Sequence, residues 1–152
     1  MRFSLRRRDF ASLMVLAATS QIVTWKSSVA DEAPLALKGY DPVAYFTDGK
    51  PVEGSPQYQA EWDHNRYQFA SERHRDLFKS DPAHYAPQFG NYCAMALSKG
   101  EIVVADPENW LINDGKLFVF GKPAPAGPVL FQQNLAENIG KANGNRSILP
   151  KQ

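Results

Sequence analysis

The side chains best suited to chemistry in this 152-residue chain are one thiol, one thioether and one imidazole. Cys93 is the only cysteine, and Met95 follows it two positions later. His74 lies on one face of an expected helix. A thiolate, a thioether and an imidazole form a soft ligand set that suits Cu(I). We therefore take these three residues as candidate metal ligands, with copper as the first choice.

Each candidate ligand also has a structural interpretation. A free cysteine packs readily as a small buried residue, and Cys93 stands beside Ala94 and close to Ala96. Because it is the only cysteine, it cannot form a disulfide within the chain. His74 would equally serve as a hydrogen-bonded residue at the edge of a core. Both interpretations stay open at this point.

Motifs of the familiar enzyme classes are absent from the sequence. There is no Gly-x-Ser-x-Gly elbow, no phosphate-binding loop and no Cys-x-x-Cys-His haem motif. The histidines also lack the His-x-x-x-His spacing of many zinc sites. An enzyme of unknown reaction is a third hypothesis, which a cleft joining His74 or His84 to a carboxylate would favour.

The first 30 residues have the pattern of a cleaved export signal. A basic head precedes an apolar stretch at 10–23, and the segment ends on small residues at Ala30. Arg7 and Arg8, followed at the second position by Phe10, match the core of a twin-arginine signal. General secretion is the alternative route. We expect cleavage near Ala30 and a periplasmic location.

The apolar stretch is shorter than the roughly 20 residues that a membrane-spanning helix needs, so no permanent anchor is expected. The first 30 residues hold five of the 17 basic residues and one of the 16 acidic ones. The remaining chain is therefore slightly acidic. Since it has no basic stripe, nucleic acid is not an expected partner.

Two β-hairpins are predicted downstream. Residues 57–69 alternate between apolar and polar around a polar turn at 63–66, which predicts one hairpin. Residues 110–120 predict the other, because Asp114-Gly115 suits the left-handed positions of a tight turn. The β-branched run Ile102-Val103-Val104 also favours an extended strand.

Helices are predicted at two places. Ser71 can cap a helix that runs to about Ser80, and a second helix is expected over about 129–142. We expect an extended linker at 121–128 and a frayed tail at 143–152. Short helices together with antiparallel hairpins indicate a small single α+β domain.

Asp-Pro occurs three times, each time with an aromatic residue three positions after the proline. Asp can accept hydrogen bonds from a first helical turn, and Pro has no N–H to lose there. We therefore expect three similar helical turns. They begin at Asp41, Asp81 and Asp106.

Two blocks of sequence resemble the longer, exported branch of the YHS domain family. They are Gly39-Tyr40-Asp41-Pro42-Val43-Ala44-Tyr45-Phe46 and Tyr92-Cys93-Ala94, and the similarity covers about 37–120. The resemblance implies a YHS-like domain over 31–120. Shorter members of the family occur beside heavy-metal-transporting ATPases, and their cysteines imply metal binding.

This chain departs from that pattern at each cysteine position. Ala44, Ala70 and His74 stand where the shorter members have thiols, so a thiolate-rich site is not implied. The leading hypothesis is a non-enzymatic periplasmic protein that binds a transition metal through Cys93 with Met95 or His74. The alternative is a metal-free structural or interaction module with an envelope protein as its partner.

Overall fold

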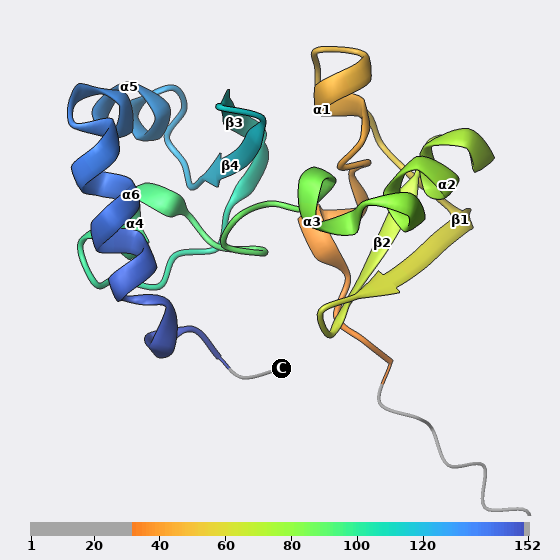
Figure 1. Ribbon diagram of the computed structural model, residues 1–152, viewed down its shortest axis with the longest axis horizontal. Coiled ribbons are helices and arrows are strands. Elements are labelled where there is room, and N and C mark those ends of the chain that lie inside the picture. Colours follow the sequence, from red (N-terminus) through yellow and green to blue (C-terminus); the bar gives the residue numbers. More distant parts are fainter. Residues whose placement is uncertain (1–31, 151–152) are drawn as a thin grey trace, which may run out of the picture. The chain divides into compact units, whose positions relative to one another are not determined.

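The computed structural model describes residues 32–150, so the predicted export signal with Arg7, Arg8, Phe10 and Ala30 lies outside the described residues. Within this range the chain forms a small α+β domain with two separate antiparallel hairpins and several short helices (Figure 1). None of the helices described is long and apolar enough to cross a membrane. The predicted fold class is confirmed.

Both predicted hairpins are present. Strands β1 (Ser55–Trp62) and β2 (Asn65–Phe69) form the first, and β3 (Asp106–Asn113) and β4 (Lys116–Phe120) form the second. Each hairpin closes on two residues with positive φ, the geometry that matches the twist of the flanking strands. The first turn is tighter than predicted, because Asn65 already pairs with Trp62.

Eight short helical elements complete the domain. They are η1 (Ala36–Gly39), α1 (Ala44–Thr47), α2 (Glu72–Ser80), α3 (Pro82–Tyr85), α4 (Ala94–Ser98), α5 (Ala126–Gln133), α6 (Leu135–Gly144) and η2 (Arg146–Ile148). The start of α2 is as predicted, because the Ser71 hydroxyl accepts a hydrogen bond from the His74 N–H at 3.2 Å.

Strand β4 is buried on both faces and links two of the three apolar cores. Phe118 and Phe120 pack into one core with Phe131 of α5. The alternating residues Leu117 and Val119 point into another core. A third core lies under the first hairpin. Its buried members are Ala36, Val43, Tyr67, Phe69, Phe78 and Ala86.

The C-terminal region differs from the prediction of a linker, one helix and a frayed tail. The single expected helix is two helices, α5 and α6, which meet at Asn134 in a non-helical conformation. Asn138 stabilises this break, because its side-chain amide donates to the Phe131 carbonyl at 3.0 Å. Asn145 in the expected tail donates to the Leu97 carbonyl at 2.8 Å. This region is therefore an integral part of the domain.

Only one of the three Asp-Pro turns follows the prediction closely. Asp81 caps α3 by accepting from the His84 N–H. Asp41 accepts from the Val43 N–H, but α1 begins one residue later and has no side-chain cap. The prediction was wrong at Asp106, which begins strand β3. Its carboxylate accepts from the Glu108 N–H in a local turn, and the strand continues afterwards.

The run Ile102-Val103-Val104 does not form a strand. Val104 makes a single isolated bridge with Tyr92, and all three side chains are exposed. The expected strand is therefore reduced to one extended bridge, because no neighbouring strand continues the pairing.

The packing of Phe131 gives the first prediction. Phe131→Ala should lower the free energy of unfolding by about 3–5 kcal/mol, since it removes a fully buried ring between Phe118 and Phe120. Chemical denaturation measures the change. The matched control on the same helix is Leu130→Ala, whose exposed side chain should cost less than about 1 kcal/mol. Equal costs for both variants would mean that α5 is not docked on the core.

Candidate functional site

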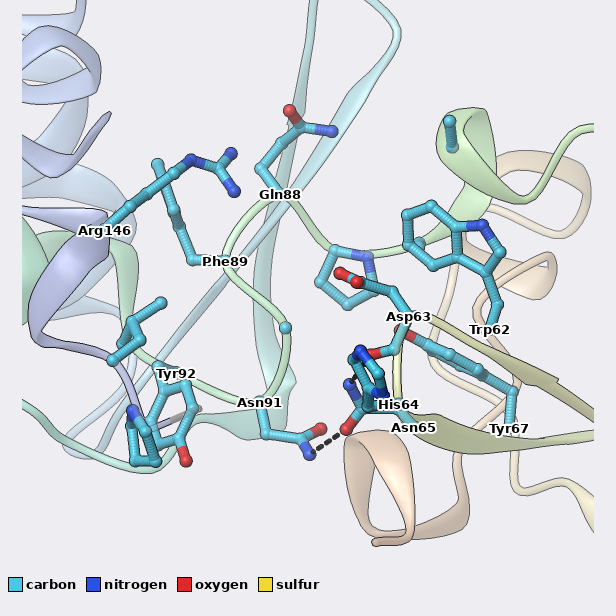
Figure 2. A pocket seen from close by; sticks show the side chains of 16 residues that line it. Trp62, Asp63, His64, Asn65, Tyr67, Gln88, Phe89, Asn91, Tyr92 and Arg146 are labelled. Atoms are coloured by element: carbon cyan, nitrogen blue, oxygen red, sulfur yellow. Dashed lines mark hydrogen bonds between the residues drawn. The ribbon is translucent and has the colours of Figure 1, made fainter. Parts of the chain in front are cut away.

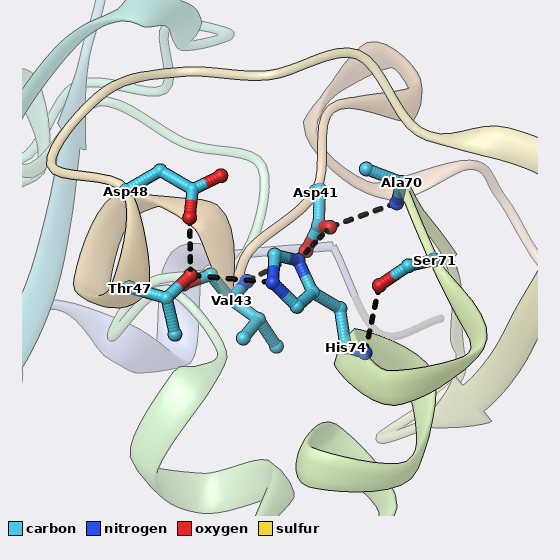
Figure 3. A network of polar contacts seen from close by, with 7 residues as sticks. All are labelled: Asp41, Val43, Thr47, Asp48, Ala70, Ser71 and His74. Carbon is cyan, nitrogen blue, oxygen red and sulfur yellow. Dashed lines mark hydrogen bonds and ion pairs between the residues drawn. The ribbon is translucent and has the colours of Figure 1, made fainter.

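His74 is held by a buried carboxylate and is not free to act as an open ligand (Figure 3). Its Nδ1 lies 2.6 Å from Oδ2 of Asp41, a residue with no exposed surface. The same oxygen accepts from the Ala70 N–H at 2.8 Å, and the other accepts from the Val43 N–H at 2.8 Å. Asp41 therefore joins the start of α1, the end of β2 and helix α2.

The other ring nitrogen of His74 lies 3.3 Å from the Thr47 hydroxyl. Carboxylate, imidazole and hydroxyl thus lie in the order found in hydrolytic triads. The Thr47 hydroxyl also has two other acceptors, the Val43 carbonyl at 3.2 Å and the Asp48 carboxylate at 2.9 Å. None of these three residues lines the groove between the turn of the first hairpin and the C-terminal segment. This hydrogen-bond network is better suited to a structural role than to catalysis.

Cys93 is buried at the beginning of α4, with 6% of its surface exposed. Its sulfur accepts a hydrogen bond from the Ala96 N–H at 3.4 Å, so the thiol serves as the helix cap. Met95 is partly buried and packs against the same core, and its sulfur lies 3.9 Å from the Ser98 hydroxyl. Both sulfurs thus have contacts that suit a packed core.

The structure does not bring the three predicted ligands together. Nδ1 of His74 contacts Asp41, and Nε2 contacts Thr47. Cys93 belongs to the core that contains Phe118 and Phe131. Helices α2 and α4 lie on opposite sides of the domain (Figure 1). Across residues 32–150, no group of three or more His, Cys, Asp or Glu side chains could hold a metal ion. Copper binding by Cys93 stays a prediction.

A groove with a volume of about 600 Å³ opens elsewhere on the domain (Figure 2). One wall is the turn of the first hairpin, and the other combines the loop before α4 with the C-terminal segment. Its lining includes Trp62, Asp63, His64, Tyr67, Gln88, Phe89, Tyr92 and Arg146. Such a volume is typical of small-molecule sites.

The two walls of the groove are tied together at one point. The Asn91 amide donates to Oδ1 of Asn65 at 3.2 Å, and Oδ1 of Asn91 accepts from the Leu37 N–H at 2.8 Å. Figure 2 shows this bond bridging the two sides of the groove. Because Asn91 is anchored on both sides, the spacing between the walls is set by the fold.

The turn at the rim of the groove carries backbone strain. Asp63 and His64 have φ values of 47° and 59°, in the left-handed region that favours glycine. The second hairpin uses the more favourable Asp114-Gly115 at the equivalent positions. Strained non-glycine residues cluster at functional sites, where the side chain has a role. The location of His64 on the groove fits that pattern.

Two half-buried aromatic rings, Trp62 and Tyr92, give the groove an apolar surface, whereas the rings of Tyr67 and Phe89 beside them are almost fully buried. Burial, and to a smaller extent the nearby Asp63 carboxylate, raises the pKa of the Tyr67 phenol, so this side chain stays neutral. The mixture of rings with a few polar groups is the usual composition of a ligand site.

The sequence did not reveal this groove, since its residues come from three separate segments of the chain. The one local signal is the Asp63-His64 turn, for which the sequence predicts only a polar hairpin turn. Comparison with known proteins found no matching family model, no matching curated protein and no matching solved structure. The resemblance to the YHS family therefore stays a prediction.

The hydrogen bonds of Asp41 predict a large loss of stability when its carboxylate is replaced. Asp41→Asn should lower the free energy of unfolding by about 3 kcal/mol, because the amide cannot accept from all three donors. Asp48→Asn is the control, since this carboxylate is exposed and should cost less than about 0.5 kcal/mol. Denaturant titration of both variants measures the two losses in the free energy of unfolding. A small loss in Asp41→Asn would show that the buried network contributes little.

The burial of Cys93 predicts slow reaction of its thiol in the native protein and fast reaction after denaturation. A colorimetric thiol reagent measures both rates.

Metal analysis of the same natively exported sample measures bound copper. If Cys93 holds Cu(I), Cys93→Ser should lose the copper while keeping the fold. Equal copper in both proteins would reject this residue as a ligand.

Proposed function

We propose that this protein is a non-enzymatic, exported binding module of the YHS type, and that its ligand site is the groove beside the first hairpin. The observation that carries the proposal is the groove itself. It has a volume of about 600 Å³ and combines two half-buried aromatic rings with the Asp63 carboxylate and the terminal nitrogens of Arg146, which have no hydrogen-bond partner within residues 32–150. The proposal shares the absence of a metal with the alternative hypothesis, but its ligand is a small molecule and not an envelope protein.

The proposal rests on a difference in hydrogen bonding between the two polar sites. Asp41 has three donors and no exposed surface, so its polar capacity is used inside the fold. In the groove, the terminal nitrogens of Arg146 and the carboxylate of Asp63 have no hydrogen-bond partner in the described part of the chain. Groups that the fold leaves unpaired are available for a ligand.

A binding role also fits the candidate chemistry better than catalysis. The carboxylate–imidazole–hydroxyl arrangement at Asp41, His74 and Thr47 does not open onto the groove. His84, the other histidine considered for an enzyme, packs its ring on Phe46 with 4.8 Å between centroids. The groove therefore has aromatic and charged surfaces to hold a molecule, with no nucleophile and base paired within it.

Blocking the groove should abolish binding. A fragment library of small aromatic acids and amines, screened by protein-observed NMR, should give hits that shift the Trp62 indole signal. Ala83→Trp places a large ring at the rim and should weaken those hits at least about tenfold, or about 1.4 kcal/mol.

Ala136→Trp is the matched control, since Ala136 is also an exposed helical alanine and does not line the groove. Its hits should bind as in the parent protein. Fragments that bind equally well to both variants, or a library that yields no hit on the groove, would contradict the proposed site.

A further inference from the structure

Two opposite charges face the groove from its two walls without pairing. Arg146 lies on the C-terminal wall and Asp63 on the hairpin turn, and both side chains point toward the open space in Figure 2. Within residues 32–150, neither makes an ion pair with any other side chain. The groove therefore has a cation on one wall and an anion on the other.

The Arg146 guanidinium is held in a defined orientation. It lies over the Phe89 ring, with 4.8 Å from Cζ to the ring centroid, and its Nε donates to Asn143 at 3.1 Å. Stacking and the Nε bond fix the plane and leave the edge with the terminal nitrogens unused. That edge matches a carboxylate, which accepts two parallel N–H bonds from a guanidinium.

The opposite wall suits a cationic group. The Asp63 carboxylate carries no hydrogen bond from the described residues, and Trp62 stands next to it on the same wall. A carboxylate beside an aromatic face attracts an ammonium group through charge and through the ring quadrupole. A molecule that joins a carboxylate at one end to an ammonium at the other would match both walls at once.

The size of the groove selects among such molecules. Its volume of about 600 Å³ suits a ligand of drug-like size and is too large for a single small amino acid to fill. A tripeptide spans at most about 10 Å when extended and carries both terminal charges. Gln88 lines the groove from the loop before α4, and its side-chain amide, which has no hydrogen bond within residues 32–150, can bond to a peptide group.

We infer that the groove binds a short free peptide, with the terminal carboxylate on Arg146 and the terminal ammonium on Asp63. This inference rests on the proposed function, because it specifies the ligand of the same groove. No covalent step is involved. The aromatic rings favour peptides with an apolar or aromatic side chain, since the half-buried Trp62 and Tyr92 would cover it.

The test uses the full chain and Ala-Phe-Ala in three forms: free, N-acetylated and C-amidated. Titration by NMR or calorimetry should give a dissociation constant that rises about tenfold or more when either end is blocked, because each block removes a charged hydrogen bond. Ala-Phe and Ala-Phe-Phe-Ala are titrated alongside, so that peptide length does not decide the result.

Two variants assign each end of the peptide to one wall. With Arg146→Gln, C-amidation should no longer matter, while N-acetylation should still weaken binding. With Asp63→Asn, the reverse should hold. Asn tolerates the left-handed conformation of this turn, and Arg146 is exposed, so both variants should fold normally.

The outcomes separate the inference from the proposed function. If no peptide binds below about 5 mM, or if blocking the ends changes nothing, the peptide inference is wrong. Fragment hits that Ala83→Trp still weakens would leave the binding groove in place. Peptide binding that is equal in Ala83→Trp and Ala136→Trp would also overturn the peptide inference, because the peptide would then bind outside the groove. The proposed function itself fails if the fragments too bind equally well to both variants.

Discussion

The first half of the domain depends on one buried carboxylate. Asp41 accepts from the N–H groups of Val43 and Ala70 and lies 2.6 Å from a ring nitrogen of His74. A carboxylate without exposed surface is costly to bury unless its lone pairs are satisfied. These three donors come from three elements, so the carboxylate is compensated only when all three are in place. The resulting constraint orients the first hairpin, whose turn forms one wall of the groove.

The sequence was most informative where structure is set locally. Asp114-Gly115 predicted its turn and Ser71 predicted its helix start, because both depend on backbone conformation within a few residues. The break at Asn134 was missed, since it is stabilised by the amide of Asn138 reaching back to α5. Asp106 was misassigned because pairing with Phe120 of β4 outweighs the local preference for a helical turn.

The candidate site was harder to predict, because neither the contacts of Cys93 nor the groove is local. Spacing alone placed Cys93 and Met95 together, and the structure assigns both sulfurs to one core. No spacing rule relates them to His74, whose partner Asp41 lies 33 positions earlier. The groove joins segments near Asp63, Phe89 and Arg146, so it becomes visible only once the chain is folded.

The polar groups of this domain differ in how many hydrogen bonds they make within the fold. Groups with several such bonds have a structural role, and groups with few can bind a ligand. The carboxylate of Asp41 and the amide of Asn91 both make hydrogen bonds that join separate elements of the fold. Asp63 and Arg146 carry full charges on two walls that the Asn91–Asn65 hydrogen bond joins. Because these two charges do not pair with each other, both stay hydrated in the free protein. A ligand that carries both opposite charges can pair with both groups, and its binding needs no movement of the walls.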